Sequence, residues 1–167
     1  MQMTDYSDFN AALAEAGDQP HKAMVALEAL TKKLVGAKLF TIMTADTVGK
    51  NSERVYSGLP DVYPVSGTKP YNETRWSEIT LKQKQTFVAN TIEDIATVFD
   101  DHEIIKSLGL GSVINVPIIV DGNVIGTLNC LHETGFYTPE RVAAAEALKL
   151  PGTICMLLHT QNKAGAH

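Results

Sequence analysis

The feature that most constrains this fold is residues 111–132, which read GSVINVPIIVDGNVIGTLNCLH. Two apolar runs rich in β-branched residues flank Asp121-Gly122, a dipeptide that supplies the positive φ values of a two-residue hairpin turn. Apolar side chains fall on both faces of both runs, which is typical of central strands covered on two sides. Pro117 has no N–H to donate, so it predicts a bulge or irregularity in the first strand. The sequence therefore predicts a central antiparallel hairpin.

The hairpin and the segment after it resemble the C-terminal half of GAF domains. The resemblance rests on a strand containing Pro117, a turn ending in Gly122, the sequence Val-Ile-Gly-Thr-Leu at 124–128, and Phe-Tyr-Thr-Pro-Glu at 136–140 opening a helix. The pattern covers residues 112–158, and the upstream order of elements is similar over nearly the whole chain. It implies a small-molecule sensory or binding fold in a family that also contains a few enzymes.

Length and composition predict one globular domain spanning residues 1–167. The chain is 44% hydrophobic and 20% charged, which provides enough core to fold alone. Its net charge of −5 and its scattered basic residues argue against nucleic-acid binding. A start without a basic segment, and no apolar run near the length of a membrane span, predict no membrane association and a cytoplasmic location. Cys130 and Cys155 fit buried thiols rather than a disulfide.

The order of elements predicts an α+β fold. Two helices are expected within residues 1–36, the sheet and pocket region within 37–132, and the C-terminal helix within 138–162. A kink or break is expected near Leu150 because Pro151 follows. Residues 58–71 have no hydrophobic period and are read as a loop. Strands are expected at 38–44, 54–57 and 86–90, and short helices at 72–83, 90–98 and 100–108. A GAF-like (PAS/profilin-like) sheet of five or six antiparallel strands is expected, with the terminal helices on one face and loops and short helices over a pocket on the other. A PAS domain is the alternative.

Strand alternation divides the side chains of the hairpin between two faces, and one of them carries the polar groups. The resemblance implies that this face lines the small-molecule pocket, where amides and a hydroxyl would bind ligand in an apolar cavity. The aromatic residues near the long loop are candidates for its wall. The candidate ligand-binding residues are Phe40, Tyr71, Trp76, Val113, Asn115, Thr127, Asn129 and Leu131. The alternative is that the polar groups bond to local backbone or water and that the aromatics are ordinary core.

No catalytic or metal-binding residue is predicted. The contiguous run at 100–103 contains metal-ligand types, but helix capping and the helix dipole explain it better. One GAF branch reduces free methionine sulfoxide with cysteines before the hairpin and carboxylates on its pocket face. Here residues 101–111 contain no cysteine, Lys106 stands near the nucleophile position, and Val113, Asn129 and Leu131 replace the carboxylates.

Three functions remain open. The leading hypothesis is a small-molecule-binding sensory or regulatory domain with an unidentified ligand, which acts through dimerisation or a partner. An enzyme outside the known catalytic branch would use His102 or His132 as acid or base. A pure interaction module would form a homodimer through the leucine-rich terminal helices. No cofactor can be named from the sequence.

Overall fold

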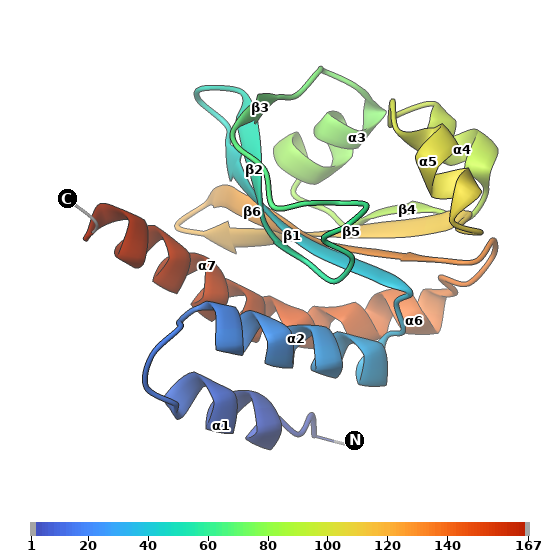
Figure 1. Ribbon diagram of the computed structural model, residues 1–167. Coiled ribbons are helices and arrows are strands. Elements are labelled where there is room, and N and C mark those ends of the chain that lie inside the picture. The colour runs from blue at the N-terminus through green and yellow to red at the C-terminus, as the bar shows by residue number, and fades with distance from the viewer. Residues whose placement is uncertain (1–2, 166–167) are drawn as a thin grey trace.

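The computed structural model describes residues 3–165, and its centre is a six-stranded antiparallel sheet of order β3-β2-β1-β6-β5-β4 (Figure 1). The strands are β1 (Leu39–Asp46), β2 (Asn51–Ser57), β3 (Lys69–Pro70), β4 (Phe87–Ala89), β5 (Ser112–Val120) and β6 (Asn123–His132). Helices and the long loop cover its two faces, which confirms the α+β class. The two-residue β3 lies inside the segment that was predicted to be loop.

The predicted hairpin is formed by β5 and β6. Val120 pairs with Asn123 across a turn in which Asp121 and Gly122 have φ values of 51° and 76°. The register shifts between Ile118 and Ile119, close to Pro117. Strand β4 pairs with β5 only as far as Asn115, so the far side of β5 is unpaired where the proline stands.

The terminal helices cover one face of the sheet (Figure 1). They are α1 (Ser7–Ala14), α2 (His21–Leu34), α6 (Pro139–Ala144), the 3₁₀ turn η2 (Ala145–Leu148) and α7 (Lys149–Ala164). Leu27 of α2 and Cys155 and Met156 of α7 are buried with the side chains of the underlying strands. Gly126 of β6 permits this close packing, because a Cβ there would collide with the Met156 methyl group and the Met43 carbonyl oxygen.

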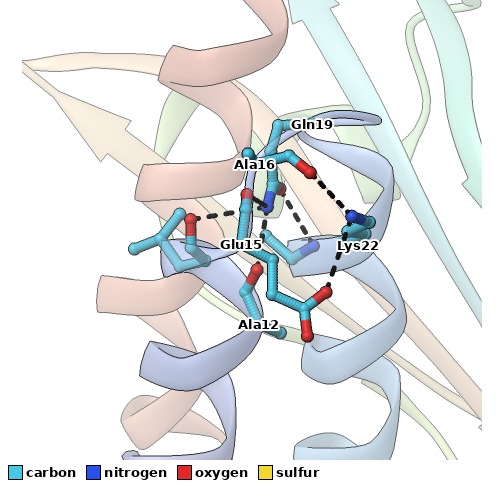
Figure 2. Close-up of polar contacts among 7 residues, drawn as sticks. Ala12, Glu15, Ala16, Gln19 and Lys22 are labelled. Carbon is cyan, nitrogen blue, oxygen red and sulfur yellow. Dashed lines mark hydrogen bonds and ion pairs between the residues drawn. The ribbon is translucent and has the colours of Figure 1, made fainter.

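Helix α1 packs outside α2, and a small polar cluster joins them (Figure 2). The Gln19 amide donates to the carbonyl oxygens of Ala12 at 2.8 Å and Glu15 at 3.1 Å, and the Lys22 ammonium donates to Ala16 at 2.9 Å. These groups satisfy carbonyls that the end of a helix leaves without intrahelical partners. The cluster therefore ends α1 and docks it on α2.

The C-terminal helical segment is interrupted between Ala144 and Lys149, close to the kink or break predicted near Leu150. The irregular turn is η2, and Pro151 lies in the first turn of α7, where its missing N–H is not required. Over its 26 residues this segment is long and apolar enough to cross a membrane by composition alone. Its inner side chains, including Cys155 and Met156, pack on the sheet, whereas Leu150 and Leu157 are exposed.

Short helices and the loop of residues 58–68 cover the opposite face (Figure 1). They are α3 (Arg75–Ser77), the π-helical turn η1 (Glu78–Lys82), α4 (Ile92–Ala96) and α5 (His102–Ser107). Below them lies a second apolar cluster that includes Leu39, Phe87, Val113 and Leu131. The sheet thus separates two cores, and the candidate site lies in the second.

Candidate ligand site

Three polar side chains from adjacent strands form a row across the second face of the sheet. Thr41 of β1 pairs with Asn129 of β6, which pairs with Asn115 of β5. We call these three residues the polar row. Their exposed fractions are only 5%, 5% and 4%, so their hydrogen bonds must come from the protein or from a bound molecule.

The row is joined by a directional chain of hydrogen bonds that begins outside it. The Trp76 indole N–H donates to Asn115 Oδ1 at 3.0 Å, Asn115 Nδ2 donates to Asn129 Oδ1 at 2.7 Å, and Asn129 Nδ2 donates to Thr41 Oγ1 at 3.1 Å. The polar side chains thus bond mainly to one another.

Trp76 forms a roof over the Asn115 end of the row. A capping box fixes the start of its helix, with Thr74 Oγ1 accepting from the Ser77 amide and Ser77 Oγ accepting from the Thr74 amide. The indole also makes edge contacts with Tyr71 and Phe99, at centroid distances of 6.4 and 6.2 Å. Trp76 is therefore positioned by its helix and by aromatic neighbours.

Tyr63 pins the long loop over the same face. Its hydroxyl donates to Asp101 Oδ2 at 2.7 Å, and the Arg54 guanidinium lies 4.9 Å from its ring centroid. Burial, followed by the hydrogen bond to Asp101, raises the pKa of the Tyr63 phenol well above its ordinary value. Asp101 makes no side-chain capping bond at the start of α5. The acidic run at 100–103 thus contributes a loop anchor there rather than a cap.

The predicted site residues occupy different places in the structure. Val113, Asn115, Thr127, Asn129 and Leu131 are buried residues of β5 and β6, with Val113 and Leu131 in the apolar cluster beside the row. Tyr71 is only partly buried at the edge of the indole. The prediction for Phe40 was wrong. It pairs with Cys130 and packs among the residues under the terminal helices, because alternation along β1 turns its neighbours Leu39 and Thr41 to the site face.

Two residues of this arrangement were missed from the sequence. Thr41 lies in the strand predicted at 38–44, and its face depends on the pairing of β1 with β6. Tyr63 lies in a loop without hydrophobic period, among Leu59, Val62 and Val65, so no local pattern distinguishes it. Side chains alternate between the two faces of a strand, so Thr41 shares the face of Leu39, and this alternation would have identified it.

The polar row presents hydrogen-bonding groups. The polar row contains no ionisable group, and residues 3–165 hold no group of three or more metal-ligating side chains. Cys130 and Cys155 are free and buried in the other core, where burial raises the pKa of each thiol to about 12. Neither forms a thiolate nucleophile near neutral pH. Two open grooves, of about 520 and 610 Å³, lie between α1 and α2 and beside β4 and α6.

Comparison with known proteins agrees with this architecture. The model of the family described as "GAF domain" matches residues 24–148. The GAF domain of a phosphoenolpyruvate-protein phosphotransferase from Coxiella burnetii superposes with a TM-score of 0.68 at 13% identity, covering 97% of this chain and 99% of that one. The GAF domain of a two-component sensor histidine kinase from Bacillus halodurans gives 0.66 at 16% identity, covering 89% and 99%.

An enzyme of the same fold is also similar. The free methionine-R-sulfoxide reductase of Neisseria meningitidis, in complex with its substrate, gives a TM-score of 0.65 at 16% identity, covering 92% of this chain and 87% of that one. No curated protein matches the sequence. At these identities the structural likenesses establish the fold alone.

Proposed function

Because this chain belongs to the GAF domain family, we propose that it is a small-molecule-binding sensory domain whose ligand occupies the face carrying the polar row. The observation that carries the proposal is the chain of buried hydrogen bonds from Trp76 to Thr41 in an otherwise apolar core. Buried polar networks are expensive unless every member is satisfied. A ligand site explains why such groups are gathered beneath a loop and an aromatic roof.

The residues around the row support binding over catalysis. The row itself offers amides and a hydroxyl, and the nearby Asp101 carboxylate accepts from the Tyr63 hydroxyl at 2.7 Å. The reductase alternative lacks support, since Val113, Asn129 and Leu131 carry no carboxylate and residues 101–111 no cysteine. Reversible binding requires none of these groups.

Native mass spectrometry of freshly purified protein, followed by denaturing release, tests the proposal. We expect the purified protein to carry a bound molecule of defined mass. If it is purified empty, we expect a member of a metabolite library to bind to it. Asn115→Leu should lose it, because the variant removes the amide at the Trp76 end of the row. Asn10→Leu, on the exposed surface of α1, should keep it. Equal retention by both variants, or an empty wild-type protein that no library member binds, would contradict the proposal.

We further propose that the terminal helices carry the output by pairing with a second copy of the chain. Leu150 and Leu157 lie seven residues apart on α7 and are 64% and 49% exposed, with the partly buried Ile154 between them. Residues at this spacing share one helix face, and an exposed apolar stripe of this kind is typical of helical dimer interfaces. The same helix packs on the sheet through Cys155 and Met156, so it connects both surfaces.

Sedimentation velocity tests this second proposal. The wild-type protein is expected to sediment as a dimer, and Leu150→Lys combined with Leu157→Lys as a monomer with unchanged circular dichroism. Ile104→Lys on α5, at a side chain 46% exposed on the opposite side of the sheet, is the matched control and should remain dimeric. A monomeric wild-type protein, or a double variant that stays dimeric, would refute pairing through α7.

A further inference from the structure

The hydrogen-bond chain also defines the chemistry of the ligand, an inference that rests on the proposed function. We propose that the ligand is an uncharged molecule with a cyclic amide edge, meaning a carbonyl and an N–H side by side, and that it replaces the hydrogen bond between Trp76 and Asn115. The carbonyl accepts from the Trp76 indole, and the N–H donates to Asn115 Oδ1.

The argument begins with which bond of the chain can open. Asn115, Asn129 and Thr41 belong to three adjacent paired strands, so their mutual bonds are fixed by the sheet. Trp76 comes from a separate short helix and is only partly buried. The contact between Trp76 and Asn115 is therefore the bond of the chain that can open without disturbing strand pairing.

Opening that bond leaves one donor and one acceptor. The indole has a single N–H and no acceptor, and Asn115 Oδ1 accepts while its Nδ2 stays committed to Asn129 at 2.7 Å. A molecule that fits between them must therefore present one acceptor and one donor on the same edge. A cyclic amide holds these two groups side by side in one plane, whereas an ether, a ketone or a tertiary amide lacks the donor.

The absence of charge in the row selects an uncharged ligand. Thr41, Asn129 and Asn115 supply no counter-ion. Asp101 accepts from Tyr63, the Arg54 guanidinium lies over the Tyr63 ring, and the Arg75 guanidinium lies over the Phe87 ring at 5.1 Å. Burying an ion without a partner is strongly unfavourable. The flanking Tyr71 and Phe99 rings are compatible with a flat, weakly polar body.

The segment that follows Trp76 contains a buried polar group without a hydrogen-bond partner. Thr80 lies four residues after Trp76 and is fully buried, and its hydroxyl has no hydrogen-bond partner within the described part of the chain. It lies in the π-helical turn η1, a geometry often found at functional sites. A segment that keeps a buried hydroxyl unpaired in this state is suited to moving between two arrangements.

Tryptophan fluorescence provides the test, because Trp76 is the one tryptophan in the chain. The probes are δ-valerolactam and uracil, their N-methylated forms without any N–H (N-methyl-δ-valerolactam and 1,3-dimethyluracil), and aminovalerate, the charged ring-opened form of the lactam. At least one cyclic amide should change the emission saturably, and its N-methylated form should bind about tenfold more weakly because Asn115 Oδ1 would be left unpaired. Aminovalerate should not bind. Asn115→Leu should abolish the response, and Asn10→Leu should retain it.

The outcomes separate this inference from the proposed function. Equal binding of the N-methylated probes or of aminovalerate would overturn the amide edge, and so would a lack of response to both cyclic amides. A ligand released from the native protein that contains no amide edge would also overturn it while leaving the sensory function intact. A protein that is purified empty and binds no library member would contradict both the amide-edge inference and the proposed function.

Discussion

Replacing Asn129 by leucine is the sharpest test of the polar row. The two side chains have similar size, so the change removes hydrogen bonds with little change in packing. Asn129 accepts from Asn115 at 2.7 Å and donates to Thr41 at 3.1 Å, and all three residues are about 95% buried. The variant loses both bonds and leaves the Asn115 amide without its acceptor.

The magnitude follows from these contacts. A buried polar group left unsatisfied costs about 1–3 kcal/mol, and the lost bond to Thr41 adds about 1 kcal/mol. We therefore expect Asn129→Leu to lower the free energy of unfolding by about 2–4 kcal/mol and Tm by roughly 5–15 °C. Urea titration, monitored by Trp76 fluorescence, measures the decrease in the free energy of unfolding. An unchanged m value would show that the variant alters stability rather than the compactness of the unfolded state.

A double variant separates the row from simple truncation. The double variant Asn115→Leu, Asn129→Leu no longer contains the unpaired Asn115 amide. Its decrease in the free energy of unfolding should therefore be smaller, by about 1 kcal/mol, than the sum of the decreases in the two single variants. Asn10→Leu on the surface should change stability by less than about 0.5 kcal/mol. If Asn129→Leu were as stable as the wild-type protein, or if the two changes were additive, the row would not be the coupled network described here.

Three further predictions concern other parts of the fold. Gly126→Ala should destabilise by more than about 2 kcal/mol in urea titration, because its Cβ would strike the Met43 carbonyl, whereas Gly67→Ala meets open space and should be neutral. Burial lowers the pKa of His132, so the unfolded chain binds more protons than the folded one. Stability should therefore fall as the pH drops below about 6.5. In His132→Gln the urea midpoint should depend less on pH. Gln19→Ala should weaken docking of α1 by about 1 kcal/mol, seen as faster amide hydrogen exchange in α1 with unchanged exchange in the sheet.

Each of these three has an outcome that contradicts it. Equal stability of the two glycine variants would mean that the close approach at Gly126 is absent. An unaltered pH slope in His132→Gln would assign the acid sensitivity to other groups. Uniform acceleration of exchange across the sheet in Gln19→Ala would show that α1 and the sheet unfold together rather than separately.

The hairpin was predicted correctly from the sequence because the signals that specify it are local. Asp121-Gly122 specifies the turn, and alternation in one continuous pair of strands assigns Asn115 and Asn129 to the same face. The GAF resemblance, rather than periodicity, supplied the placement of that face toward a pocket, and the family match supports GAF over the PAS alternative.

The errors concern features decided by distant contacts. Phe40 was chosen for its aromatic ring, although the face of a residue in β1 is fixed by its register against β6, about ninety residues later. Tyr63 finds its partner, Asp101, across the loop, and no local pattern encodes that contact.

The central claim, that the face beneath Trp76 is a ligand site, is tested most directly by NMR of the indole N–H in the presence of a bound small molecule. The chain has one tryptophan, so its indole cross-peak reports on the bond to Asn115 without ambiguity. We predict that ligand addition shifts this peak together with the side-chain amide peaks of Asn115 and Asn129. A molecule that binds by native mass spectrometry and leaves all three signals unmoved would contradict the account.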